Sequence, residues 1–146
     1  MSESVVEVYA LHEKIVLTPL AWWEDLGAWT ATNVVEVVGP TSTDEELGNA
    51  VIRLLKLPAS PELDPKASEL TLRAAGVRSH AALVRQARYV FVRLDMGDGL
   101  LTVVGSVRDE RGGGWATKHP DDGVVLTRPS PSEVGSAVNR EIDSST

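Results

Sequence analysis

The sequence predicts a single α+β domain over residues 1–146, in which a mainly antiparallel sheet is covered by about three helices. Three observations support this prediction. First, a chain of 146 residues with 42% hydrophobic side chains buries roughly 68% of its unfolded surface, so one core forms without disulfide or metal. Second, short β-branched runs alternate with turn signals near both ends. Third, two helix capping boxes each follow a short apolar run, so a strand–helix unit is used twice.

The first third of the chain has the patterns of short strands. Residues 5–11 and 14–18 are brief and rich in β-branched side chains, which favours strands. Pro19 then opens a segment with two adjacent tryptophans, which we interpret as a helical turn that ends at Gly27. Residues 33–38 form an apolar run closed by a Gly-Pro turn signal, as is typical of a buried strand.

The middle of the chain is predicted to be helical. Thr43 and Glu46 form a capping box, and the apolar stripe that follows stops at Pro58. The Pro-rich residues 58–65 are interpreted as a loop that is too short to separate domains. A second helix is expected over residues 66–75, ended by a glycine, and a third follows the N-cap Ser79.

The last third contains the clearest hairpin. Residues 89–94 and 100–107 are apolar strands, and the five residues between them are rich in the Gly and Asp that a hairpin turn needs. Two further short strands and a final helix are predicted at residues 115–118, 123–127 and 132–142.

The two capped helices repeat each other at an offset of 87 residues. The second begins at Ser130 and Glu133, with Pro131 at the favoured first helical position. Each helix also carries a glycine in its second turn, Gly48 and Gly135, at a cost of about 1 kcal/mol relative to Ala. We expect this cost to be offset by close approach of each helix to the sheet or to its twin. A ligand held against the glycines is the alternative.

The charge of the chain is strongly acidic and unevenly distributed. The net charge is −7 and the pI is near 4.9. Residues 1–49 carry −8, residues 50–93 carry +5 and the remainder carries −4. Because nucleic-acid binding needs a basic stripe, the balance argues against a direct nucleic-acid partner. The charge serves either solubility alone or the electrostatic steering of a basic partner.

The residue types that carry catalysis or metal binding show no recognisable pattern. The chain has no cysteine, and its three histidines lack metal-ligand spacing. No Gly-x-Ser-x-Gly elbow is present, and the glycines at 112–114 lack the Lys-Ser/Thr of a phosphate loop. The first residues lack the features of a signal peptide, and no run of ~18 apolar residues occurs. We therefore predict a cytoplasmic protein without catalytic residues, metal or cofactor, and without a membrane segment.

Three stretches of the sequence form a pattern that a known family shares: residues 75–79 leading to the strand after Tyr89, residues 115–127, and residues 132–138. Together they resemble the contact-dependent growth inhibition immunity proteins (CdiI). More narrowly, the chain is similar to a group built around a Ser/Asp-Glu-Leu-Gly-x-Ala helix, here residues 43–51 and their repeat. The resemblance implies a cytoplasmic antidote that binds the C-terminal toxin domain of a delivered effector, commonly a nuclease. It would block the active site or substrate entry of that domain and would not itself be an enzyme.

A contact set for such a toxin follows from aromatic and acidic residues, because Trp is a frequent binding anchor and carboxylates can mimic phosphate. Adjacent tryptophans cannot both point inward, so one of them is expected to be exposed beside acid. The predicted toxin-binding residues are Trp22, Trp23, Glu24, Asp25, Asp44, Glu45, Asp121 and Asp122.

Two other functions remain open at this point. One is a small hydrolase that uses paired carboxylates, such as Asp109 and Glu110, with or without Mg²⁺. The other is a nucleic-acid adaptor in which Arg78, Arg85 and Arg88 line one exposed face. We expect instead that the basic middle of the chain pairs with its acidic first third.

Overall fold

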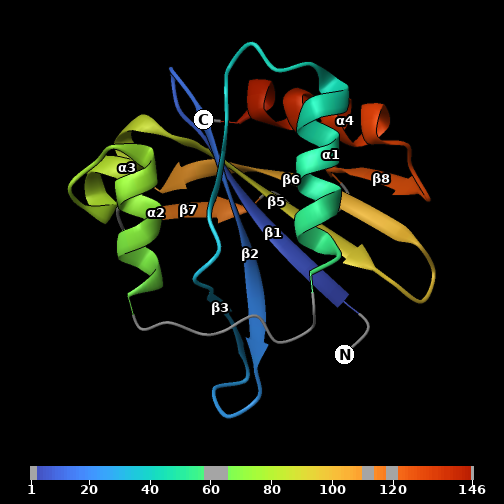
Figure 1. Cartoon of the computed structure of the whole chain (residues 1–146), viewed down its shortest axis with the longest axis horizontal. Coiled ribbons are helices and arrows are strands. Elements are labelled where there is room, and N and C mark those ends of the chain that lie inside the picture. Colours follow the sequence, from blue (N-terminus) through green and yellow to red (C-terminus); the bar gives the residue numbers. More distant parts are fainter. Residues whose placement is uncertain (1–2, 58–65, 110–113, 118–121, 146) are drawn as a thin grey trace.

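An antiparallel sheet forms the centre of the computed structural model, which describes residues 3–57, 66–109, 114–117 and 122–145 (Figure 1). The strand order is β3-β2-β1-β5-β6-β7, with β4 also paired to β2 and β8 to β6. In the described part of the chain the strands are β1 Glu3–Ala10, β2 Ile15–Trp23, β3 Ala28–Ala31, β4 Glu36–Val38, β5 Arg88–Asp95, β6 Leu100–Asp109, β7 Gly114–Thr117 and β8 Val124–Thr127. The helices are α1 Asp44–Leu55, α2 Ala67–Ala75, α3 His80–Gln86 and α4 Pro131–Ser144. The predicted α+β class and antiparallel sheet are confirmed.

The chain uses one order of elements twice. β4 pairs with the start of β2 and β3 with its end, just as β8 pairs with the start of β6 and β7 with its end. Each set of four strands then leads into a capped helix, α1 or α4, and β1 pairs with β5 at the centre. The predicted strand–helix repeat is therefore confirmed, and it extends to five elements per half, with α2 and α3 between the halves.

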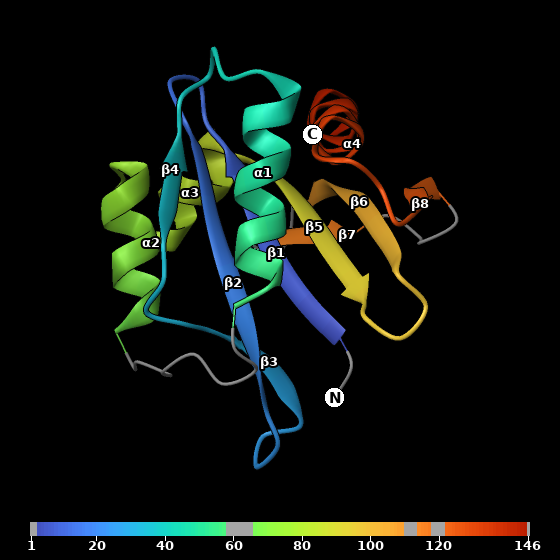
Figure 2. The same cartoon turned by 45° about the vertical axis from the view of Figure 1, so that its right-hand side comes forward.

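The repeated helices pack on one face of the sheet and touch backbone to backbone (Figure 2). A Cβ at Gly48 would lie 1.7 Å from the carbonyl oxygen of Pro131, and one at Gly135 would lie 1.7 Å from that of Asp44. Asn139 Nδ2 also donates to Asp44 Oδ1 at 2.7 Å. The expectation that each glycine allows close approach to the twin helix is confirmed. Beneath the helices lies the larger core, including Val6, Val8, Leu17, Leu47, Val51, Val92, Leu101, Val103, Val134 and Val138.

The opposite face of the sheet is only partly covered. Helices α2 and α3 pack over one end of this face, where Leu83 and Ala75 contact Tyr9 and Val16. The αL residue Gly76 ends α2, and Ser79 caps α3 by accepting from the Ala82 amide, as the sequence predicted. This second, smaller core leaves the rest of the face without a covering helix among the described residues.

Two predictions for the first third of the chain are wrong. Residues 33–38 do not form a buried strand, because β4 covers only Glu36–Val38 and Val37 is 50% exposed. The segment from Pro19 to Gly27 is not a helical turn, because β2 continues through Pro19 to Trp23 and a turn follows before β3. Proline is tolerated here because the outer edge of β2 has no strand partner at that residue, between the positions paired to β4 and to β3. The Thr32 hydroxyl instead donates to the Pro19 carbonyl at 2.9 Å. The predicted loop at 58–65 and the glycines at 112 and 113 lie outside the described residues, whereas Gly114 begins β7.

Candidate functional site

The uncovered end of the second sheet face is the candidate site, and we call it the open face. It consists of the side chains of Glu3, Phe91, Arg93, Asp95, Leu100, Thr102, Val104 and Thr117. Alternation along the strands places them there, because successive side chains point to opposite faces. Val90 and Val92 of β5 enter the helix-covered core, so Phe91 and Arg93 stand on the other side. The pairing register aligns Arg93 of β5 with Thr102 of β6.

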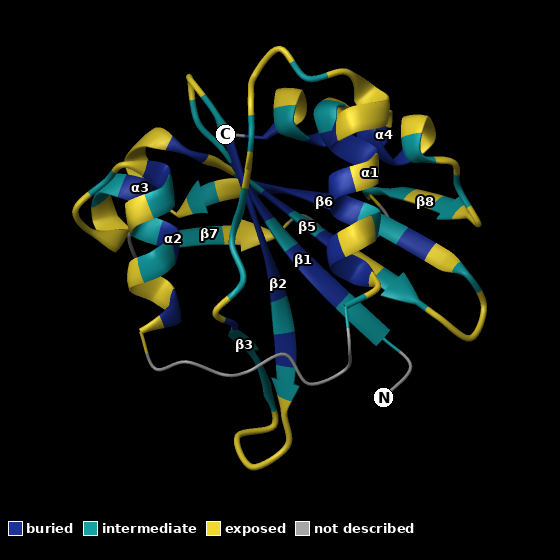
Figure 3. Cartoon of the chain, in the orientation of Figure 1, coloured by how far each residue is buried: buried dark blue, intermediate teal, exposed yellow. Residues whose placement is uncertain are grey.

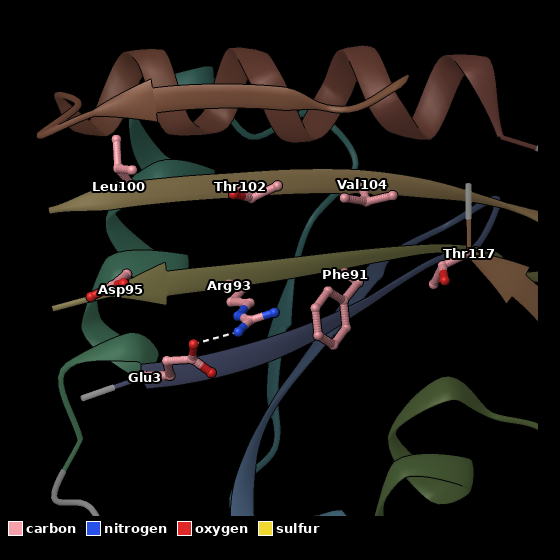
Figure 4. Close-up of a pocket in the computed structure, with 8 residues that line it drawn as sticks. All are labelled: Glu3, Phe91, Arg93, Asp95, Leu100, Thr102, Val104 and Thr117. Atoms are coloured by element: carbon pink, nitrogen blue, oxygen red, sulfur yellow. Dashed lines mark hydrogen bonds and ion pairs between the residues drawn. The ribbon is translucent and has the colours of Figure 1, made fainter. Parts of the chain in front are cut away.

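These residues line a shallow hollow of about 300 Å³ (Figure 4). Phe91 and Val104 give it an apolar floor on neighbouring strands, and Thr117 borders it from β7. Glu3 and Arg93 form an ion pair within it. The Arg93 side chain still keeps 51% of its surface exposed, so this pair stabilises the fold little and leaves its charges accessible to a partner.

Asp95 closes the hollow at the β5–β6 turn. Its Oδ1 accepts hydrogen bonds from the amides of Gly97 at 2.9 Å and Asp98 at 3.4 Å. The carboxylate therefore holds the turn in shape while its charge remains at the edge of the open face. A binding surface needs this kind of support, because a contact residue on an ordered turn loses less entropy when a partner docks.

The half-buried carboxyl group of Glu7 lies between the open face and the end covered by α2 and α3. Tyr89 donates its hydroxyl to Glu7 Oε2 at 2.5 Å. Burial raises the pKa of Glu7 above its usual value, and the hydrogen bonds from Tyr89 and Tyr9 oppose that rise, as does nearby His80. Trp115 stacks on Tyr89 with ring centroids 5.2 Å apart. Tyr9, Tyr89 and Trp115 thus form an aromatic cluster between the covered end and the open face.

The β2–β3 hairpin continues the open face at its far edge. Trp22 packs edge-on against Trp29, with ring centroids 5.5 Å apart, and Trp23 on the other side of the strand is 40% exposed. Glu24 and Asp25 occupy the exposed turn that follows (Figure 3). The expectation that one of two adjacent tryptophans is exposed beside acid is confirmed. These four predicted contact residues are consecutive in the hairpin, but Trp22 and Trp23 project from opposite sides of β2.

The other predicted contact residues lie elsewhere. Asp44 and Glu45 are exposed in the first turn of α1, at the top of Figures 1 and 2, whereas the β2–β3 turn is at the bottom. Asp122 is exposed just before β8, and Asp121 lies outside the described residues. The structure therefore does not gather the predicted set into one patch.

Sequence reasoning missed the centre of the open face. The sequence predicts Phe91, Arg93 and Thr102 only as strand residues and Asp95 only as part of the hairpin turn, and it assigns Glu3 to no element. A signal was present in β5, where valine and leucine alternate with Tyr89, Phe91, Arg93 and Asp95. Such alternation is typical of a strand with one face in the core and the other accessible.

The basic middle of the chain pairs in part with the acidic first third. Arg53 pairs with Glu36, and Arg93 pairs with Glu3, in line with the expectation from the charge distribution. Arg78 and Arg85 are exposed around α3, at the covered end of the face. Arg88 projects to the opposite side of the sheet, where it donates to the carbonyl of Ile142 in α4 at 3.4 Å.

Two kinds of feature are absent from the ranges that the structure describes. No group of three or more His, Asp or Glu side chains gathers there in a way that could hold a metal ion. None of the helices described is long and apolar enough to cross a membrane. Among the adjacent carboxylates of the chain, Glu24 and Asp25 lie on an exposed turn, and the pairs that contain Glu110 and Asp121 each have one member outside the described part.

Comparison with known proteins places the fold. No protein-family model matches the sequence, and no curated protein matches it either. Among solved structures, a protein of unknown function from Neisseria meningitidis matches with a TM-score of 0.72 and 16% identity, over 99% of this chain and 96% of that one. A chain of the CdiA-CT/CdiI toxin and immunity complex from Yersinia pseudotuberculosis matches with a TM-score of 0.69 and 13% identity, over 99% and 97%. The chain thus shares its whole fold with a component of a toxin and immunity complex.

Proposed function

We propose that the chain is an immunity protein that binds a toxin domain of the contact-dependent growth inhibition type and neutralises it. The likeness in fold to a chain of the Yersinia complex, over nearly the full length of both chains, carries the proposal. The acidic charge of −7 supports it, because a toxin that attacks nucleic acid must attract phosphate and is therefore basic. An acidic inhibitor gains association rate against such a target.

The proposed mechanism is stoichiometric. The immunity protein acts in the cytoplasm, covers the active site or the substrate entry of the toxin, and contributes no catalytic group of its own. Binding of this kind needs an exposed surface with apolar anchors and compatible charge, held on an ordered scaffold. The open face and the β2–β3 hairpin meet these requirements among the described residues.

The direct test is co-expression with the toxin domain encoded beside this chain. Growth should stop when the toxin domain is expressed alone and should recover when this chain is present. A catalytically inactive toxin variant, which leaves growth unaffected, is the control for expression burden. The proposal predicts a complex that co-elutes in size-exclusion chromatography, whereas unrelieved toxicity together with separate elution would contradict it.

Titration separates a binder from an enzyme. If the chain acts by binding, toxin activity in vitro should fall linearly with added chain and reach its minimum at a fixed molar ratio. An antidote that acts by catalysis would protect at far lower ratios, given time. In a stoichiometric complex each molecule of this chain neutralises a fixed number of toxin molecules. Full protection by this chain at about one hundredth of the molar amount of toxin would therefore exclude the stoichiometric mechanism.

A further inference from the structure

We propose that the open face, together with the β2–β3 and β5–β6 turns that border it, is the docking surface for a basic face of the partner. This inference rests on the proposed function and names the surface that performs it. Three features of the molecule carry it: an uncovered sheet face, apolar anchors on that face, and a carboxylate border opposite a basic end.

The first feature is the missing cover. α1 and α4 bury one whole face of the central strands, whereas α2 and α3 bury only the end around Tyr9 and Val16 of the other. The sheet face beyond Phe91 has no covering helix in the described ranges. A half-covered sheet with a hollow of about 300 Å³ offers a preformed concave surface to which a partner can bind.

The second feature is apolar surface at this end of the sheet. Phe91 and Val104 lie side by side on the floor of the hollow, and Leu100 at its edge is 37% exposed. The Trp22 and Trp29 pair extends the surface at the far hairpin. Aromatic side chains in a desolvated centre provide most of the binding energy of protein interfaces.

The third feature is the charge at the border. Carboxylates stand on both turns and between them, at Glu3, Glu24, Asp25, Asp95 and Asp98. The described bases beside them are Arg93, already paired to Glu3, and Arg128, whose amide donates to the Gly99 carbonyl. An incoming basic surface would therefore meet an excess of negative charge.

The covered end of the same face has the opposite sign. Lys14, Arg73, Arg78 and Arg85 lie on or next to α2 and α3, and the described acids of that end include Glu13 and Glu69. The face is thus polarised from a basic covered end to an acidic open end. Such a field orients a basic partner toward the open end and away from the helices.

The test is a charge-reversal experiment with the catalytically inactive toxin domain encoded beside this chain as probe. The variant Glu24→Lys/Asp25→Lys/Asp98→Lys changes three exposed turn residues whose side chains make no hydrogen bond described above. The matched control, Glu13→Lys/Glu69→Lys/Asp143→Lys, makes the same charge change at exposed residues away from the open face. Binding kinetics are measured at 50, 150 and 500 mM NaCl, about 14 to 4 Å in Debye length.

We expect the open-face variant to associate about 10- to 100-fold more slowly than the control at 50 mM NaCl, with the difference shrinking to a few-fold at 500 mM. A second variant, Thr102→Arg, fills the hollow, so its loss of affinity should exceed 10-fold and persist at high salt. Unchanged circular dichroism and thermal melting of each variant confirm that the fold is intact.

Three other outcomes would overturn the inference. Equal binding by wild type, both open-face variants and the control would place the interface elsewhere while leaving the proposed function intact. A loss confined to Glu45→Lys/Asp122→Lys would move the interface to α1 and β8. Self-association that the open-face variant abolishes would assign this surface to a second copy of the chain. Absence of any wild-type binding would instead contradict the proposed function itself.

Discussion

The two faces of the sheet are built from the same strands and differ in their roles. On the face under α1 and α4, Val92 and Leu101 are almost fully buried, and the two helices touch through glycine. On the other face, Phe91 and Arg93 of the same strand β5 remain accessible beyond α2 and α3. Stability is thus concentrated on one face, which leaves the other free to carry charge and a hollow. Substitutions that are neighbours in sequence should therefore have different consequences.

The largest effect is expected at the helix crossing. Gly48→Ala would place a methyl group 1.7 Å from the Pro131 carbonyl oxygen, so α1 and α4 must separate. We expect a loss of about 3 kcal/mol in the free energy of unfolding, measured by urea denaturation. Gly114→Ala is the control, because its Cβ would meet no atom within 4 Å. Similar stability of the two variants would show that the helices do not rely on close contact.

Two adjacent leucines of β6 compare the faces directly. Leu101 is 2% exposed beneath the helices, whereas Leu100 is 37% exposed at the open face. Leu101→Ala should cost about 3 kcal/mol in unfolding free energy, and Leu100→Ala less than about 1 kcal/mol. If the open face is the docking surface, Leu100→Ala should lower the free energy of toxin binding by more than it lowers the free energy of unfolding. Leu101→Ala should not. The reverse pattern would exchange the roles of the two faces.

A smaller loss of stability is expected at the N-caps of the two helices that cover one face. Thr43 and Ser130 each accept the amide of the Glu three residues later, in complete capping boxes. Thr43→Ala and Ser130→Ala should each lower the free energy of unfolding by about 1 kcal/mol in urea denaturation. An effect at one cap only would show that the repeated helices differ in how much each depends on its N-terminal turn.

The smallest expected effect is a pH dependence at Glu7, on the border of the two regions. The pKa of Glu7 is raised in the fold by burial, so the folded chain holds a proton that the unfolded chain releases. The stability that protonated Glu7 contributes to the fold is fully present below its ordinary pKa of 4.5, and it is lost as the pH rises through the raised pKa. Glu7→Gln should therefore be more stable than wild type at pH 8, with the difference narrowing toward pH 4.5.

The measurement for this effect is the difference in thermal stability between wild type and variant across that pH range. Tyr89→Phe, which removes the hydroxyl that donates to Glu7, should deepen the loss at pH 8. A constant difference between Glu7→Gln and wild type would mean that Glu7 does not titrate differently in the folded state.

The repeated helices were predictable because their signals are local. Capping boxes at Thr43 and Ser130, and glycines that cost stability, point to helix starts and to close packing. The β2 segment was misjudged because Pro19 is acceptable only where neighbouring strands leave a gap, and that gap depends on the pairing of distant residues. Local pattern carries no information about such a gap.

The candidate site was less predictable than the fold. Trp22 to Asp25 are consecutive, so the sequence could bring them together. Glu3, Arg93 and Thr102 meet only through the register of β1, β5 and β6. Asp44, Glu45 and Asp122 are acidic as well, but they lie in other parts of the molecule. Charge predicts the kind of partner, whereas topology decides which charges act together.

Hydrogen–deuterium exchange of the chain, alone and in complex with the inactive toxin domain, tests the docking surface most directly. Protection on binding should concentrate at residues 24–27 and 95–100, the two turns that border the open face. The amides of α1 and α4, on the far face of the sheet, should exchange as they do in the free chain. Protection confined to α1 and α4, or to α2 and α3, would contradict the assignment of the open face as the interface.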